Sequence, residues 1–138
     1  MKSWLVDTGP LVAYLDAGDE KHLRAAACLG GLRGQLYTTG AVITEAMHFV
    51  SADDRGPSLL VEFVAVSNML VRECTSADQL QRAAALMGKY SNTPMDFADA
   101  TLVQLADELK TREIVTFDRR GFSTYRTGSG KSFILVCF

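Results

Sequence analysis

Two aspartates each follow a short apolar run of the sequence. Asp7 comes directly after residues 3–6, and Asp118 comes directly after the β-prone run 114–117. If both runs are parallel strands, their carboxyl ends meet at one edge of a sheet, where open α/β sheets bind ligands. Aspartate also caps turns and helix N-termini, and for either residue alone that role is favoured. As a pair, the two roles are evenly balanced, and a shared sheet edge is expected.

A third carboxylate, Glu45, lies on the apolar face of a helix predicted over 41–51. At about 100° per residue, Val42 falls about 60° and Phe49 about 40° from Glu45 around the helix. A carboxylate on that face loses hydration, so it needs a proton, a cationic partner or a metal. A position at the rim of the face, reaching water or an arginine, is equally consistent with this pattern.

The helix predicted over 95–110 carries two more aspartates near its start. Asp99 lies about 60° from Leu102, at the edge of the apolar stripe, and Asp96 lies about 60° further outward. Both could simply stabilise the positive end of the helix dipole, a contribution of about 0.3–1 kcal/mol each. That interpretation suits Asp96 better, because Asp99 borders the core and needs a partner. The stripe itself consists of Ala98, Leu102, Leu105, Ala106 and Leu109.

Four carboxylates from four elements, with no cluster of histidine or cysteine, form an all-oxygen ligand set. Such a set suits Mg²⁺ or Mn²⁺ better than zinc. Divalent cations held in this way hydrolyse phosphodiesters, because they activate water and stabilise the attacking and leaving oxygens. An acidic metal site does not itself select RNA, so a DNA nuclease or a phosphatase is an alternative. A non-catalytic binding domain, whose acids only hold structure, is another.

The elements that must position these acids alternate along the chain, and 138 residues predict a single domain over 1–138. The alternation predicts an α/β fold, a three-layer α/β/α sandwich with a mainly parallel central sheet. Thr38 or Thr39 could cap the helix over 41–51, and Ser76 with Gln79 matches a capping box. The predicted strands are 3–6, 35–38, 70–73, 114–117 and 133–136, and the predicted helices are 11–15, 19–29, 41–51, 58–66, 76–89 and 95–110.

Composition limits the class of protein. With 48% hydrophobic and 22% charged residues the chain is an ordinary globular protein, and the net charge of −2 excludes a generally basic coat for nucleic acid. No apolar run is long enough for a membrane span. The three cysteines are widely spaced, so neither a disulfide framework nor a zinc site is indicated and the cytoplasm is expected. Cys28 and Cys137 are expected to be small buried hydrophobic residues.

A glycine-rich segment near the C-terminus resembles the end of a phosphate-binding P-loop. Residues 128–132 read GSGKS, but Tyr125 stands where the motif requires its first glycine. The segment also leads into a β-prone run rather than a helix, so it lacks the helix N-terminus that would hold the phosphate. Nucleotide binding is therefore excluded.

Four segments of the chain together resemble PIN-domain ribonucleases, notably VapC-type toxins. They occur in the order typical of that family and span nearly the whole chain. The segments are VDTGPLVAYLD at 6–16, ITEA at 43–46, MDFADATLV at 95–103 and TFDRRGF at 116–122. The resemblance implies a PIN-like fold and a Mg²⁺- or Mn²⁺-dependent RNA endonuclease, the toxin of a type II toxin–antitoxin pair. It also implies a homodimer and an antitoxin segment that covers the acidic cleft.

The resemblance further implies roles for individual residues. Thr8 and Thr116, each beside an aspartate, would supply supporting hydroxyls, and Asp96 is an alternative to Asp99 as the third ligand. Arg119 and Arg120 are candidates for contact with the RNA backbone, with Arg126 and Lys131 further along the chain. For any one of them a solvated surface charge is the favoured alternative, and Arg119 or Arg120 could also balance the acidic cluster. The acids that match the family's catalytic and metal-binding site are Asp7, Glu45, Asp99 and Asp118.

Overall fold

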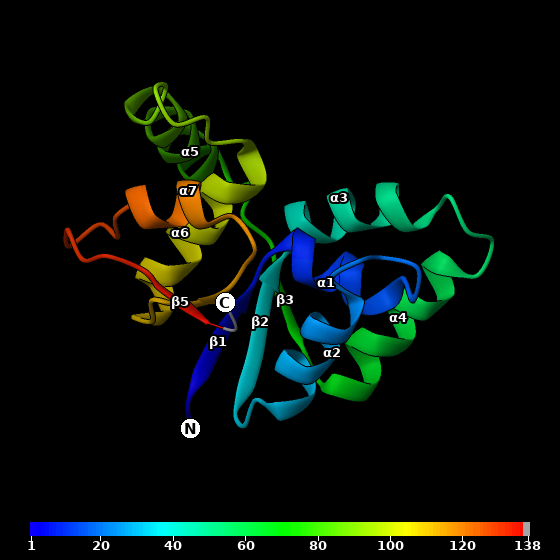
Figure 1. The fold of residues 1–138 in the computed structure, drawn as a ribbon. Coiled ribbons are helices and arrows are strands. Elements are labelled where there is room, and N and C mark those ends of the chain that lie inside the picture. The colour runs from blue at the N-terminus through cyan, green and yellow to red at the C-terminus, as the bar shows by residue number, and fades with distance from the viewer. Residues whose placement is uncertain (137–138) are drawn as a thin grey trace.

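The central strand of the structure is β1 (Ser3–Val6), which lies in the middle of a five-stranded sheet. The structure is a computed structural model that describes residues 1–136. All strand pairs are parallel, and Leu5 of β1 is in register with Tyr37 on one side and Ile114 on the other. The mainly parallel sheet predicted from the sequence is confirmed (Figure 1). Its order is β3 (Leu70–Arg72), β2 (Gln35–Thr39), β1, β4 (Glu113–Val115) and β5 (Ile134–Val136).

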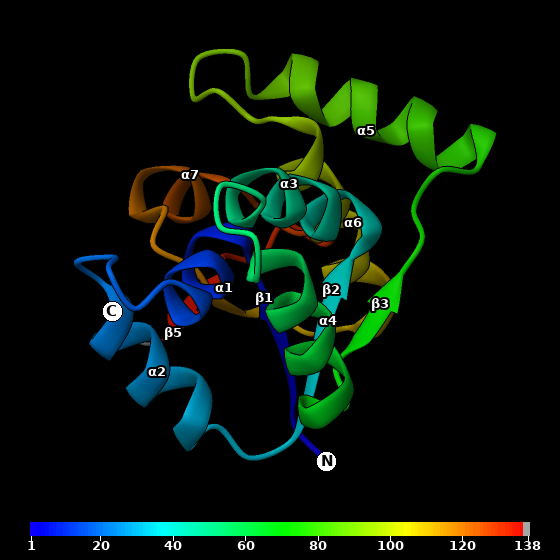
Figure 2. The ribbon, with the colours of Figure 1, turned by 90° about the vertical axis from the view of Figure 1, so that its right-hand side faces the viewer.

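Helices cover both faces of this sheet, which confirms the predicted three-layer arrangement (Figures 1 and 2). One face carries α1 (Thr8–Leu15), α2 (His22–Gly31), α3 (Gly40–Val50) and α4 (Gly56–Ser67). The other face carries α5 (Ala77–Lys89), α6 (Phe97–Leu109) and the short helix α7 (Arg119–Thr124). Because α3 also contacts α6, the two helical layers approach each other beyond the carboxyl ends of the central strands.

The core explains why the central strands are continuous apolar runs. Leu5 and Val6 of β1 and Ile114 and Val115 of β4 are at most 1% exposed, as expected for strands that are covered on both faces. The helix α6 is buried on nearly every side from Ala100 to Ala106, so only its two ends approach the surface, with Asp99 half-buried near the start and Asp107 and Glu108 exposed near the end.

Two predicted helix caps are confirmed. The Thr39 hydroxyl accepts a hydrogen bond from the Val42 N–H at 3.3 Å and caps α3, the helix that carries Glu45. Ser76 and Gln79 form the expected capping box at the start of α5. These local signals fix where the helices begin, independently of the packing around them.

Several element boundaries differ from prediction, and two of these differences involve the predicted acids. α1 begins at Thr8, directly after Asp7, rather than at residue 11. β4 ends at Val115, so the prediction that Asp118 directly follows a strand is wrong. The physical reason is that the Thr116 side chain bonds to groups beyond the sheet, which turns the chain out of the strand and into α7.

One expectation about the cysteines is also wrong. Cys28 is disulfide-bonded, although cysteine spacing indicated no disulfide, because spacing along a chain does not show which side chains meet in space. Cys74 is free and buried, and Cys137 lies outside the described residues. Over residues 1–136, no helix has the length and apolar character needed to cross a membrane.

Candidate active site

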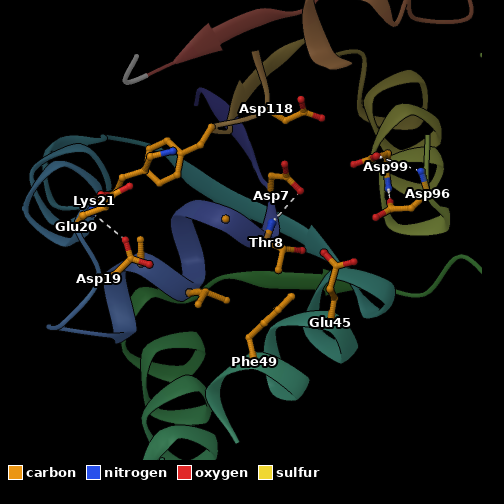
Figure 3. Close-up of a pocket in the computed structure, with 14 residues that line it drawn as sticks. Asp7, Thr8, Asp19, Glu20, Lys21, Glu45, Phe49, Asp96, Asp99 and Asp118 are labelled. Atoms are coloured by element: carbon orange, nitrogen blue, oxygen red, sulfur yellow. Dashed lines mark hydrogen bonds between the residues drawn. The ribbon is translucent and has the colours of Figure 1, made fainter. Parts of the chain in front are cut away.

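A cavity of about 660 Å³ lies at the carboxyl end of the sheet, beside α1, α3 and α6. Seven carboxylates and one ammonium group line it among the described residues, so its surface is strongly acidic. Figure 3 shows carboxylates from separate elements directed toward a common space. All four predicted catalytic acids, and Asp96, line this one cavity. The charged lining residues are Asp7, Asp19, Glu20, Lys21, Glu45, Asp96, Asp99 and Asp118.

Asp7 is the most buried of these acids, only 8% exposed at the end of β1. Its Oδ2 accepts a hydrogen bond from the Thr116 hydroxyl at 2.7 Å, and its Oδ1 accepts one from the Thr8 N–H at 2.8 Å. Burial nevertheless raises the pKa of Asp7 to about 6, because desolvation outweighs both hydrogen bonds and neighbouring carboxylates add repulsion. The ionised Asp7 is therefore well oriented but lacks positive charge nearby.

Asp96 and Asp99 cap α6 through two reciprocal hydrogen bonds. The Asp99 N–H donates to Asp96 Oδ1 at 2.8 Å, and the Asp96 N–H donates to Asp99 Oδ2 at 3.2 Å. Asp96 is exposed and Asp99 is half-buried. Burial, together with the charges of Asp7 and Asp96, raises the pKa of Asp99 to about 8. Of the two, Asp99 is thus the acid with the greater need of a cation.

Glu45 is half-buried on α3, and its carboxylate points into the cavity (Figure 3). The neighbouring Val42 and Ala46 are fully buried, which agrees with the apolar face predicted for this helix. Within residues 1–136 the Glu45 carboxylate has no hydrogen-bond donor and no ion-pair partner, so the arginine partner considered from the sequence is not found there. A cation in the cavity would supply the missing partner.

Asp118 is exposed and lies at the start of α7. Its Oδ1 accepts a hydrogen bond from the Gly121 N–H at 2.9 Å and caps that helix. Its own N–H donates to the Thr116 hydroxyl oxygen at 3.0 Å, while that fully buried hydroxyl donates to Asp7. One threonine side chain therefore links the two aspartates.

Thr8 contributes an unpaired hydroxyl to the same cavity. Its side chain is 5% exposed, and its Oγ1 has no hydrogen-bond partner among the residues that the structure describes. A buried polar group left unpaired costs about 1–3 kcal/mol, so such groups usually face a water, an ion or a ligand. The Thr8 hydroxyl fits an oxygen-rich group bound beside Asp7.

The basic residues singled out from the sequence do not line this cavity. Arg119 and Arg120 lie exposed on the first turn of α7, and the RNA contact predicted for them stays a prediction. The Arg126 guanidinium donates to three nearby backbone carbonyls, and Lys131 lines a different cavity.

The cavity includes residues that the sequence did not single out as functional. Phe117 lies between Thr116 and Asp118 in the segment TFDRRGF. This position next to a predicted acid was the sequence signal that could have identified it as a site residue. Lys21 had none, because it precedes α2 and reaches the site only through the fold. The added lining residues are Asp19, Glu20, Lys21, Phe49 and Phe117, with Gly9, Val12 and Ala13 of α1.

The side chains of this cavity fit a hard divalent cation. Within residues 1–136, no group of three or more histidine, cysteine, aspartate or glutamate side chains is close enough to enclose a metal as it stands. Mg²⁺ does not need such a cage, because it keeps several waters and is commonly held by one or two carboxylates with substrate phosphates. The donors here are all oxygens, and the unpaired Thr8 hydroxyl lies beside the buried Asp7.

A relative of known name decides the family. Over 135 residues the chain is 31% identical to Ribonuclease VapC26 of Mycobacterium tuberculosis, a match that covers 96% of this chain and 98% of that protein. The chain belongs to the VapC family of ribonucleases. The resemblance of the four acidic segments to PIN-domain VapC proteins is thereby confirmed. No protein-family model matches the sequence.

Two solved structures share the fold of this VapC chain. Mycobacterium tuberculosis VapC20, a toxin that cleaves the sarcin–ricin loop, matches with a TM-score of 0.72 at 22% identity, over 84% of this chain and 90% of that one. VapBC2 from Rickettsia felis, bound to a DNA fragment from its promoter, matches with a TM-score of 0.62 at 13% identity, over 98% and 99%. At these identities the likeness shows a common fold.

Proposed function

We propose that this VapC chain is an endoribonuclease that hydrolyses RNA phosphodiester bonds with a bound Mg²⁺ or Mn²⁺. The observation that carries the proposal is the convergence of carboxylates from four elements on one cavity, two of them with a raised pKa. Carboxylates gathered in this way repel one another unless a cation lies among them. The acids proposed to hold it are Asp7, Glu45, Asp99 and Asp118.

Individual residues of the chain have separate roles in orienting the acids and contacting the substrate. A bound divalent cation would supply the charge that activates water and stabilises the leaving oxygen at phosphorus. Thr116 orients Asp7 through a 2.7 Å hydrogen bond, and Asp96 orients Asp99 through the capping box. The Thr8 hydroxyl has no hydrogen-bond partner among the described residues, and it would donate to a phosphate oxygen or to a water.

RNA cleavage with and without metal tests this function. We expect the purified chain to cleave bacterial RNA with Mg²⁺ or Mn²⁺ and to lose that activity in EDTA. Equal cleavage in EDTA would show that the reaction needs no divalent cation. A matching DNA oligonucleotide should be cut far more slowly, and equal rates would instead favour a general metal-dependent nuclease.

Separate substitutions of Asp96 and Asp99 identify which of the two is the third metal ligand. Asp99→Asn is expected to abolish cleavage, whereas Asp96→Asn is expected to keep it, because asparagine caps a helix about as well as aspartate. Loss of activity in Asp96→Asn, with activity retained in Asp99→Asn, would reverse the assignment. Circular dichroism of both variants confirms that α6 is still formed.

The substrate and partners of the chain are also proposals. Because VapC20, which shares the fold, cleaves the sarcin–ricin loop, an RNA stem–loop of that sequence is the first defined substrate to test. We propose that the chain is the toxin of a toxin–antitoxin pair, since the VapBC2 structure shows the same fold. Co-purification with the product of an adjacent small open reading frame tests the antitoxin. Light scattering tests the homodimer, which has twice the 15.0 kDa chain mass.

A further inference from the structure

At one side of the acidic cavity, cationic side chains pack against the aromatic ring of Phe117. The Lys21 Nζ lies 4.9 Å from the centroid of that ring, and the Arg24 guanidinium carbon lies 5.2 Å from it. Phe117 is half-buried and lines the cavity between Thr116 and Asp118. The ring therefore holds the Lys21 ammonium beside the proposed catalytic acids.

The position of the Lys21 ammonium is not explained by the stability of α2. Lys21 is the N-cap residue of that helix and makes no capping hydrogen bond with its side chain, and Arg24 lies in the first turn. Cations at a helix N-terminus oppose the positive end of the helix dipole, which favours acidic residues there. The first turn of α2 contains no acidic residue to offset them.

The Lys21 ammonium is also not paired with the acids next to it, although the Lys21 backbone N–H donates to Asp19 Oδ1 at 2.8 Å. Asp19 and Glu20 precede it directly, yet within residues 1–136 its ammonium forms no ion pair and lies over the aromatic ring instead. A cation held against an aromatic face by about 0.5–2 kcal/mol keeps its N–H donors available for another acceptor. The ring thus fixes where the ammonium lies without using up its hydrogen-bonding capacity.

The charge of the cavity indicates a role for the Lys21 ammonium. Lys21 is the one cationic side chain that lines the cavity among the described residues, against seven carboxylates. An RNA strand brings further negative charge to these carboxylates, and phosphate contacts with lysine and arginine supply most of the sequence-independent affinity for nucleic acid. A cation at the rim therefore sets where the backbone can approach the acids.

We propose that Lys21, positioned by Phe117, binds a backbone phosphate of the RNA next to the bond that is cut. This inference rests on the proposed ribonuclease function and, beyond it, identifies the side of the cavity through which the RNA strand enters. Phe117 acts as a positioning residue for the Lys21 ammonium. Lys21 thereby takes the backbone-contacting role that the sequence suggested for arginines of α7.

RNA binding measured by fluorescence anisotropy tests the inference. The probe is the sarcin–ricin stem–loop RNA with a fluorescein label, and the protein is the full chain carrying Asp7→Asn so that the RNA stays intact. We expect Lys21→Ala to weaken binding about tenfold and to lower the slope of log affinity against log salt by about 0.7–0.9, the value for one phosphate contact. Lys89→Ala is the matched control, because the Lys89 ammonium lies 5.3 Å from the Tyr90 ring and outside this cavity.

A second pair of measurements separates positioning from structure. Phe117→Leu keeps apolar bulk but removes the aromatic ring. It should weaken RNA binding when Lys21 is present, and it should cause little further loss of affinity in a chain that already carries Lys21→Ala. With Asp7 intact, Lys21→Ala should raise the KM for RNA cleavage several-fold and leave kcat within about twofold, since it removes binding made equally in substrate and transition state. Lys21→Arg should restore the affinity.

The outcomes that overturn the inference differ from those that overturn the proposed function. If Lys21→Ala binds RNA as tightly as Lys89→Ala and with the same salt slope, the phosphate contact at Lys21 is wrong while the ribonuclease proposal stands. If the chain with intact Lys21 neither binds nor cleaves RNA, the proposed function fails and this inference fails with it.

Discussion

The ends of β1 and β4 look alike in sequence and differ in the folded chain. Asp7 follows β1 directly, is almost completely buried and accepts hydrogen bonds on both carboxylate oxygens. Asp118 lies beyond the end of β4, is exposed and uses one oxygen to cap α7. Burial raises the pKa of Asp7 to about 6. Of these two aspartates, burial rather than the motif therefore marks Asp7 as the one with the greater need of a cation.

Thr116 connects these two regions. Its hydroxyl donates to Asp7 and accepts from the Asp118 N–H, so the loop after β4 orients the acid at the end of β1. The comparison predicts that Asp7 anchors the cation and that Asp118 contributes from the solvent side. Substitutions at the three positions should then have graded effects.

The largest effect is expected for Asp7→Asn. The amide keeps the shape of the side chain but removes the buried charge, and we expect RNA cleavage to fall by about 10²–10³-fold, a loss of about 3–4 kcal/mol of transition-state stabilisation. Single-turnover cleavage at saturating Mg²⁺ measures this rate. A fall of less than about threefold, a difference of under 1 kcal/mol, would show that Asp7 is not the anchor.

Thr116→Val should have the next largest effect. It removes the hydroxyl that orients Asp7 and leaves the Asp118 N–H without its acceptor, so we expect activity to fall about 10–100-fold. The Thr116 hydrogen bond lowers the pKa of Asp7, so its loss raises that pKa further and moves the acidic limb of the pH–rate profile to higher pH. Thr116→Ser keeps the hydroxyl and is the control. A profile that does not move contradicts the link.

Asp118→Asn should reduce cleavage by only about tenfold, since an exposed carboxylate contributes less than a desolvated one. Asparagine can still cap α7, whereas Asp118→Ala also loses the cap and about 1 kcal/mol of stability. Cleavage rates and thermal denaturation of both variants separate the two roles. If Asp118→Asn is as damaging as Asp7→Asn, the two strand ends are equivalent and the comparison fails.

A further prediction concerns the stability of the metal-free chain. Asp7 and Asp99 have pKa values raised to about 6 and about 8, so the folded state binds protons more tightly than the unfolded state. The free energy of unfolding should therefore fall as pH rises from the unfolded value of 3.8 toward these pKa values. Thermal denaturation in EDTA should show this decline in the wild type and less of it in Asp99→Asn. An equal decline in both would contradict it.

Much of this arrangement could be predicted from the sequence. The apolar runs around Leu5 and Ile114 and the capping patterns at Thr39 and Ser76 are local signals, so the strands, most helices and the α/β class follow from them. The acids could be placed on their elements because strand ends and helix faces follow from periodicity. Predicting that these acids share one cavity required, in addition, the inference of a parallel sheet and the resemblance to VapC proteins.

The rest depends on contacts between segments that are distant in sequence. The turn of β4 into α7 follows from the hydrogen bond between Thr116 and Asp7, which joins residues far apart in the chain. Lys21 reaches the cavity because α2 packs on α1, and nothing near Lys21 in the sequence indicates this. Arg119 and Arg120 showed the opposite case, since proximity to Asp118 in sequence did not bring them into the cavity lining.

Binding of Mn²⁺, followed by electron paramagnetic resonance, tests the central claim most directly. The claim is that the acidic cavity holds a divalent cation anchored by Asp7. We expect the wild-type chain to bind Mn²⁺, Mg²⁺ to displace it, Asp118→Asn to bind it more weakly and Asp7→Asn to lose the site. A wild-type chain that binds no Mn²⁺, or an Asp7→Asn chain that binds it as tightly as the wild type, would contradict the claim.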